Sequence, residues 1–261
     1  MPRSKIGLGQ NCLNLPLRQL LPALAKLGAA GVELHAVADL APAQLSQTGR
    51  RELRQLLRGH GLEVASVFCP LRRGLANPEN QEARLDYLRQ ALTMSYELGP
   101  RVVVIEPGPL PKGDEDPQAP VFMEALAALG RHGDRVGAML ALETGLDAAA
   151  ELDRFLGRFD SGGLGVSFNP GNLLIHGHEP LAAARTLNRR IVTVHAKDAR
   201  LAGAGRAAQE VPLGHGDIDW LALLAALEEV EYRGWLTIVR GAPASAAEIG
   251  ASVQFLKRLG A

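Results

Sequence analysis

The sequence predicts a single-domain (β/α)8 TIM barrel over residues 1–261, because one alternation recurs along the whole chain. Eight short apolar runs alternate with longer segments in which apolar residues recur at helical period. Parallel strands need crossovers, and closing the sheet into a ring leaves no unpaired edge. The first run leads into Gly7-Leu8-Gly9-Gln10-Asn11, which lacks the third glycine of a dinucleotide-binding turn. That absence counts against the alternative, a doubly wound open sheet.

The predicted strands are short and apolar, and turn or charged residues bound them. In chain order they cover Lys5–Leu8, Gly31–Leu34, Leu62–Phe68, Arg101–Ile105, Gly137–Glu143, Leu164–Phe168, Ile191–His195 and Gly234–Val239. The predicted helices cover Pro16–Leu27, Pro42–His60, Asn80–Leu98, Gln118–Val136, Leu146–Arg158, Pro180–Asn188, Trp220–Val230 and Ser245–Leu259. Residues 107–120 and 203–208 are predicted to be long loops on the catalytic face.

The predicted helices have the expected faces and ends. Apolar residues at positions 85, 88, 91 and 92 form one stripe, with charges on the other side. Leu98-Gly99-Pro100 ends that helix, since glycine accepts a left-handed cap and proline cannot continue the helix. Prolines at 16, 42 and 180 are predicted in first turns, where a missing N–H costs nothing.

Composition narrows the class of protein. Hydrophobic residues make up 47% of the chain and charged residues 21%, which favours a globular core over disorder. The 28 basic and 28 acidic residues cancel, so the basic excess typical of nucleic-acid binders is missing, and we expect no nucleic-acid partner. Cys12 and Cys69 fit no metal or disulfide spacing, which favours a reducing, cytoplasmic location. With no leader and no run of 18 apolar residues, we expect no membrane partner.

Four consecutive predicted strands end in residues of different chemistry. Glu143 ends the fifth strand, Asn169 follows the sixth, His195 ends the seventh and Val239 ends the eighth. In a barrel the carboxyl ends of the strands meet at one face. Glutamate and histidine suit a divalent metal ion, whereas an asparagine amide suits it poorly and valine supplies no donor.

Seven segments occur in an order and spacing that identify a family. They are Gly31-Val32-Glu33-Leu34, Leu98–Val104, Leu142-Glu143-Thr144-Gly145, Asn169-Pro170-Gly171-Asn172-Leu173, Val194-His195-Ala196-Lys197-Asp198, Pro212–Trp220 and Tyr232–Ile238. With these segments the chain resembles, over nearly its whole length, the xylose isomerase-like TIM barrels. That group contains sugar (phosphate) isomerases and epimerases and also the apurinic endonucleases.

The resemblance implies a site for one divalent cation, and this chain departs from it. Family members usually hold the cation with Glu on strand 5, Asp on strand 6, His on strand 7 and Glu on strand 8. Glu143 and His195 match this set, while Asn169 replaces the aspartate and Val239 the second glutamate. One negative charge then remains where a hard cation needs about three. We therefore expect a weak or absent site for Mn, Mg, Zn or Co, held by Glu143 and His195, with Asn169 as a further ligand through its carbonyl oxygen.

The resemblance also suggests roles for individual residues. Glu143 is the candidate base and His195 the candidate electrophile or metal ligand. Five residues are candidates for binding the substrate: Glu33, His35, Asn169, Lys197 and His215. Glu106 ends the fourth strand, where a solvated carboxylate is the commoner interpretation and part of a shifted site the other.

Three functions compete at this point. The first is an isomerase or epimerase acting on a small sugar, sugar acid or cyclitol. The second is a non-catalytic barrel that binds a carbohydrate or serves as a scaffold. The third, a repair endonuclease, is disfavoured because Asn172, Glu210 and Val239 stand where His, His and Glu are expected for its zinc cluster. The Ala- and Leu-rich helices would suit a homodimer and equally an ordinary barrel exterior.

Overall fold

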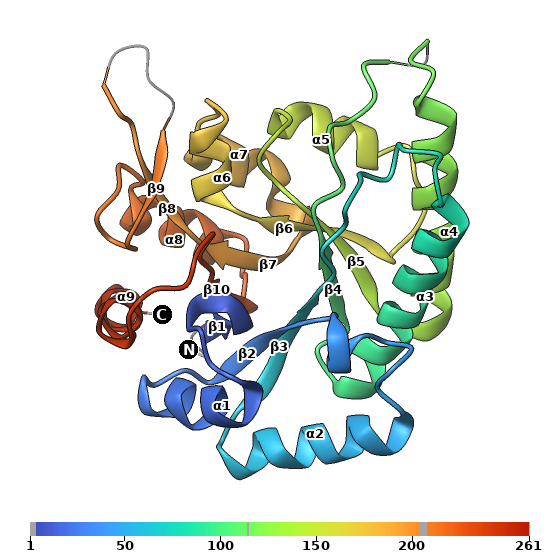
Figure 1. Ribbon diagram of the computed structural model, residues 1–261. Helices are drawn as coiled ribbons and strands as arrows, with labels where there is room; N and C mark the ends of the chain where they lie inside the picture. The colour runs from blue at the N-terminus through green and yellow to red at the C-terminus, as the bar shows by residue number, and fades with distance from the viewer. Residues whose placement is uncertain (1–3, 114, 204–207, 261) are drawn as a thin grey trace.

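Figure 1 shows a computed structural model of the protein, which describes residues 4–113, 115–203 and 208–260. Within these ranges eight parallel strands close into a barrel in the order β1-β10-β7-β6-β5-β4-β3-β2, which confirms the predicted (β/α)8 fold. The barrel strands are β1 (Lys5–Gly9), β2 (Gly31–His35), β3 (Glu63–Phe68), β4 (Val102–Ile105), β5 (Met139–Glu143), β6 (Leu164–Phe168), β7 (Ile191–Ala196) and β10 (Trp235–Ile238).

Helices surround the strands, as Figure 1 shows. They are α1 (Leu17–Lys26), α2 (Gln47–Gly59), α3 (Gln81–Leu98), α4 (Ala119–Val136), α5 (Ala149–Leu156), α6 (Pro170–Ile175), α7 (Pro180–Leu187), α8 (Trp220–Glu229) and α9 (Ala246–Arg258). Short 3-10 turns lie at η1 (Gln10–Cys12), η2 (Ala38–Leu40) and η3 (Asn188–Arg190).

The alternation of side chains along each strand separates the apolar core from the barrel interior. On β5, Leu140 and Leu142 are buried in the large core that the strands share with the helices. Ala141 instead packs with Val102 and Val104 of β4 in a small separate cluster. Because successive strand residues face opposite sides, Glu143 continues the face of Ala141 and points into the barrel at its mouth.

The structure adds three features that the sequence patterns did not predict. Helix α6 begins directly after Asn169, and its six residues are too short to give a periodic signal. Strands β8 (Asp198–Arg200) and β9 (Gln209–Val211) pair antiparallel in the loop after β7. Helix α2 begins at Gln47 instead of Pro42, because the Ser46 hydroxyl caps it by accepting from the Gly49 N–H. Part of the predicted loop 203–208 lies outside the described residues.

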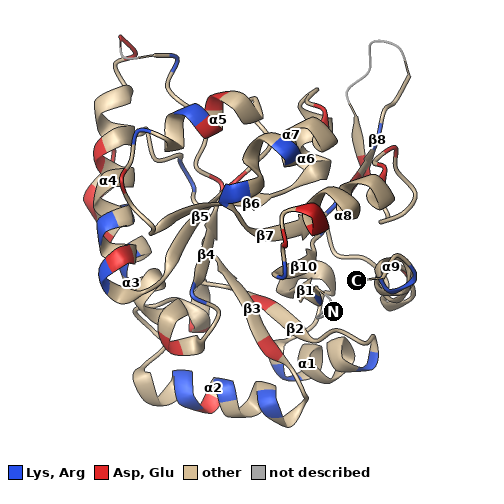
Figure 2. Cartoon of the chain, turned by 180° about the vertical axis from the view of Figure 1, so that it is seen from behind, with Lys and Arg blue, Asp and Glu red and all other residues tan. Residues whose placement is uncertain are grey.

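The outer helices carry both signs of charge. Figure 2 shows basic and acidic residues on the helices that ring the barrel, α2 and α3 among them. Among the described residues, none of the helices has the length and apolarity needed to span a bilayer.

Candidate functional site

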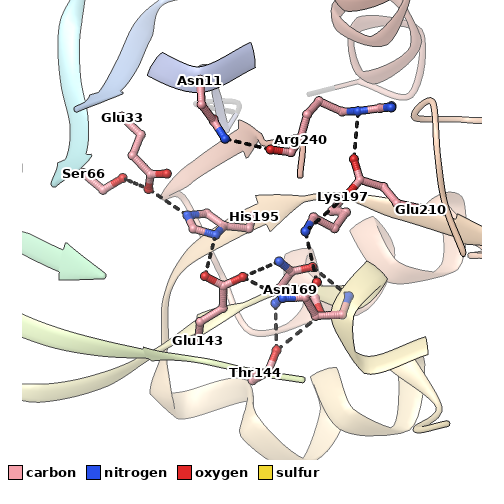
Figure 3. A network of polar contacts seen from close by, with 11 residues as sticks. Asn11, Glu33, Ser66, Glu143, Thr144, Asn169, His195, Lys197, Glu210 and Arg240 are labelled. Carbon is pink, nitrogen blue, oxygen red and sulfur yellow. Dashed lines mark hydrogen bonds and ion pairs between the residues drawn. The ribbon is translucent and has the colours of Figure 1, made fainter. Parts of the chain in front are cut away.

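Three strand ends bring Glu33, His195 and Glu143 into one chain of polar contacts, drawn in Figure 3. Glu33 comes from β2, His195 from β7 and Glu143 from the end of β5. His195 Nε2 lies 2.7 Å from Glu33 Oε2, and His195 Nδ1 lies 3.2 Å from Glu143 Oε2. The side chains are only 2%, 3% and 5% exposed for Glu33, His195 and Glu143. Buried charges of this kind are stable only when paired.

The contacts determine the protonation of His195. Each ring nitrogen faces a carboxylate oxygen, and an ionised carboxylate can only accept a hydrogen bond. Burial by itself would lower the pKa of His195, but the charges of Glu33 and Glu143 outweigh burial and raise the pKa to about 10. Burial by itself would raise the pKa of Glu33. The charge of His195 and the Ser66 hydroxyl, which donates to Glu33 Oε2 at 2.6 Å, outweigh burial and lower that pKa. At neutral pH the chain is therefore an imidazolium held between two carboxylates.

Two asparagine amides hold the other oxygen of Glu143. Asn169 Nδ2 donates to Glu143 Oε1 at 2.5 Å and Asn172 Nδ2 donates to the same oxygen at 2.9 Å. Both amide orientations are determined by groups that can only donate. Asn169 Oδ1 accepts the backbone N–H of Asn172 at 3.0 Å and caps α6, and Asn172 Oδ1 accepts from the Lys197 ammonium at 3.1 Å. Glu143 thus has three hydrogen-bond donors around its carboxylate.

Lys197 connects this cluster to a second set of charges, also visible in Figure 3. Its Nζ lies 3.5 Å from Glu210 Oε2 on β9. Glu210 pairs in turn with Arg240 at 2.8 Å, and Arg240 with Glu248 at 2.9 Å. Asn11, after β1, donates to the backbone oxygen of Arg240 at 2.8 Å. The hairpin after β7 and the loops after β1 and β10 are therefore joined around the mouth of the barrel.

The donors present do not fit the divalent cation that the resemblance implies. His195 Nδ1 and Glu143 Oε2 could share a cation, but Asn169 turns its amide hydrogens toward Glu143 and uses its oxygen in the helix cap. Val239 is 8% exposed and has no donor atom. Within the described ranges, no three His, Cys, Asp or Glu side chains form a metal-binding cluster. Two donors fall short of the four or more that such ions take in proteins.

The other predicted site residues lie in different places. His35 ends β2 and packs against Phe68, with ring centroids 5.0 Å apart. Burial lowers the pKa of His35, and nearby Glu33 opposes that shift. His215 is exposed on the loop after β9, where its backbone oxygen accepts from Arg200. The structure thus brings Glu33, Asn169 and Lys197 together with His195 and Glu143, while the His215 side chain stands apart on the surface.

Asp198 anchors the turn that carries His215. Its Oδ2 accepts from the backbone N–H groups of Gly214 and Gly216 at 2.9 and 3.1 Å, and its Oδ1 accepts from Ala199 at 2.9 Å. Asp198 is only 1% exposed. These bonds hold the loop that follows β9 against the end of β7, beside Lys197.

A cavity of about 300 Å³ opens beside the cluster at the mouth of the barrel. Its lining includes Arg72, Glu106, Glu143, Thr144, Asn172 and His176. Partial burial raises the pKa of Glu106, and the Glu143 charge adds to that shift. The volume is at the lower end of the range of small-molecule sites.

Sequence reasoning missed several of these residues. Ser66 lies within strand β3, which was predicted correctly, so the strand assignment held a usable signal. Glu106, which the sequence offered as part of a shifted site, lines the cavity. The role of Asn172 follows from the short helix α6, which turns the residue back toward Glu143. Glu210 and Arg240 meet only because of the β8–β9 hairpin, for which the sequence offered no pattern that we recognised.

Comparison with known proteins places this site in a family context. The model of the family described as xylose isomerase-like TIM barrel matches residues 21–259. An inosose dehydratase from Lacticaseibacillus casei is 29% identical over 131 residues, which cover 43% of this chain and 44% of that protein. The rhizopine catabolism protein MocC from Rhizobium meliloti is 27% identical over 255 residues, covering 85% of this chain and 74% of that protein.

Among solved structures, a xylose isomerase domain protein from Planctomyces limnophilus shares the fold. Its TM-score is 0.87 at 24% identity, covering 99% of this chain and 98% of that one.

Proposed function

Because the chain belongs to the xylose isomerase-like TIM barrel family, we propose that it acts on a small carbohydrate or cyclitol at the mouth of its barrel. The observation that carries the proposal is the buried Glu33–His195–Glu143 chain next to a cavity of about 300 Å³. Burying charged side chains costs stability, and groups with such perturbed pKa values cluster at functional sites. In a barrel these sites lie at the carboxyl ends of the strands.

The reaction we infer is removal of a proton from the carbon beside a carbonyl group. Ketose isomerisation and epimerisation begin with this step, and so can loss of water from an inosose, the reaction named for one relative. The carbonyl oxygen becomes negatively charged as the proton leaves. Arg72 and Arg73 bring positive charge to the cavity lining, and charges held in place at a site stabilise such an oxyanion.

We further propose that this chemistry proceeds without a resident divalent cation. The support is the orientation of Asn169 and the apolar side chain of Val239. Elemental analysis of the purified protein after extensive dialysis checks the point. We expect far less than one Mn, Mg, Zn or Co per chain, and near-stoichiometric metal would contradict the proposal.

The activity itself can be measured by hydrogen exchange. The dialysed protein is incubated in D2O with a panel of ketoses, sugar acids that carry a ketone and inososes, and proton NMR follows the C–H signals next to the carbonyl. We expect loss of that signal for at least one compound. His195→Gln should slow the loss by about 10²-fold, because it releases Glu143 at the cavity wall and a misplacement of about 1 Å at a site costs that much.

The exposed Glu52→Gln on α2 is the matched control and should exchange at the wild-type rate. The proposed function would be contradicted if no compound of the panel bound to the protein and none exchanged its hydrogen. Binding without exchange would leave a carbohydrate-binding protein and would exclude the proposed reaction.

A further inference from the structure

The register of β4 and β5 places a second carboxylate beside Glu143. Val104 pairs with Ala141 and Ile105 pairs with Leu142. The next residue on each strand is Glu106 and Glu143, so the two lie side by side at the carboxyl ends of neighbouring strands. Both continue the inward face that begins with Val104 and Ala141, because strand residues alternate between faces.

The two carboxylates differ in their partners. Glu143 accepts from two amides and lies next to the His195 ring, which leaves it buried and firmly held. Among the residues that the structure describes, no hydrogen bond or ion pair reaches the Glu106 carboxylate, which is only partly buried at the mouth. Neighbouring carboxylates in such different surroundings commonly divide into a permanent anion and a group that exchanges protons.

Glu106 is favoured for contact with a ligand because it lines the cavity and because its carboxylate is not held by other residues. Glu106 and Glu143 line the same cavity, with Asn172 and Thr144 on the Glu143 side and Arg72 from the loop after β3. A ligand there can approach Glu106 without breaking any bond of the buried chain. Using Glu143 as the base would first require loosening at least one of its three donors.

We propose that Glu106 is the catalytic base and acid of this barrel, and that Glu143 stays ionised as the anchor of His195. This inference rests on the proposed function. It moves proton transfer to strand 4, away from Glu143, which the family resemblance suggested, and from Val239, which has no ionisable group.

The step balances without a further reagent. The Glu106 carboxylate takes the proton from the carbon beside the carbonyl, and the C–H electron pair becomes the C=C bond of an enediolate. The carbonyl π pair moves to the oxygen, and Arg72 and Arg73 in the cavity lining supply positive charge to stabilise it. Protonated Glu106 then exchanges its proton with water and returns one to the carbon, which gives the isotope exchange measured in D2O.

The test compares Glu106 variants with the full-length wild type on whichever compound of the panel exchanges. We expect Glu106→Gln to bind that compound within about threefold of the wild-type Kd by calorimetry and to lose exchange by about 10²–10⁴-fold. Glu106→Ala should regain part of the exchange when formate is added, because formate fits the vacated space and can take the proton. A purely structural role for Glu106 would give no formate rescue.

Several results would overturn the inference. Glu106→Gln that exchanges at the wild-type rate would exclude Glu106 as the base while leaving the proposed function intact. Loss of binding in proportion to loss of exchange would identify Glu106 as a binding residue only. If the wild type exchanges no compound, the proposed function fails and this inference fails with it. Glu52→Gln again serves as the control away from the site.

Discussion

His195 has an environment very different from that of a solvated side chain. Both of its nitrogens are committed to carboxylates, so it cannot act as a free base at neutral pH. We propose that its role is to hold Glu33 and Glu143 together at the mouth of the barrel. Removing one partner of a buried ion pair typically costs about 3–5 kcal/mol, because the other charge is left unpaired.

His195→Gln should therefore lower the free energy of unfolding by about 3–5 kcal/mol at pH 6. The pKa of His195 rises from 6.5 to about 10 on folding, so its stabilising contribution is complete below pH 6.5 and disappears as the pH rises through 10. The difference between wild type and variant should shrink over that window. Urea unfolding at a series of pH values measures it.

The exposed pair Lys5–Glu63 is the control for this experiment, with side chains 51% and 62% exposed. Lys5→Ala should cost at most about 1 kcal/mol at low salt. If both variants lost the same free energy of unfolding at pH 6, burial would contribute nothing to the strength of the His195 pairing.

We propose that Asn169 and Val239 are the two residues that weaken metal binding. Asn169→Asp combined with Val239→Glu should restore two carboxylates and give measurable Mn²⁺ affinity by calorimetry. Without metal the double variant should be less stable than wild type, because it buries like charges beside Glu143, and Mn²⁺ should raise its melting temperature. The single variants are the controls. No gain in affinity would mean that the two positions do not face a common point.

At the scale of elements, the buried side chain of Asp198 holds the loop after β7. The glycines that Asp198 contacts have no room for a side chain. A Cβ built on Gly216 would lie 1.9 Å from Asp198 Oδ1. Gly216→Ala must therefore displace Asp198 and release its bonds to Gly214 and Ala199.

We expect Gly216→Ala to destabilise the protein by about 1–3 kcal/mol, the cost of unsatisfied buried polar groups. Hydrogen exchange should increase in β8 and β9 before it increases in the barrel strands. Gly59→Ala in α2 is the matched control, since nothing lies within 4 Å of its added Cβ. It should be neutral or slightly stabilising. Unchanged protection of β8 and β9 in Gly216→Ala would contradict the anchoring role of Asp198.

The barrel strands could be predicted from the sequence, but some contacts of the candidate site could not. All eight barrel strands were predicted within two residues at each end, because each is an apolar run between turn residues. Convergence of Glu143, Asn169 and His195 followed from those strand ends. The hairpin β8–β9 was missed because three-residue strands leave no periodic pattern. The pairing of Glu33 with His195, and the different surroundings of Glu106 and Glu143, depend on side-chain conformations that strand patterns do not contain.

At the scale of the whole molecule, the barrel is closed by its first and last strands. Four residue pairs join β1 to β10, from Lys5 with Trp235 to Leu8 with Ile238. Helix α9 lies over this seam near α1, and its Ile249, Val253 and Leu256 are fully buried. The last helix therefore contributes to the closure of the whole ring.

Leu256→Ala should lower the free energy of unfolding by about 2–5 kcal/mol, since the ring cannot collapse into the space left. Gln254→Ala, on the exposed side of the same helix, should change it by less than about 0.5 kcal/mol. Chemical denaturation followed by circular dichroism compares the two. Equal values for both variants would mean that α9 is not part of the cooperative unit.

The double use of the Asn169 side chain has an evolutionary consequence. One oxygen caps α6 while the amide nitrogen faces Glu143, so an aspartate could keep the cap and replace only the inward-facing group. Asparagine and aspartate codons differ by a single base, as do certain valine and glutamate codons. One point mutation at each position would therefore supply the two carboxylates that this barrel lacks, with the local backbone of α6 preserved at the Asn169 step.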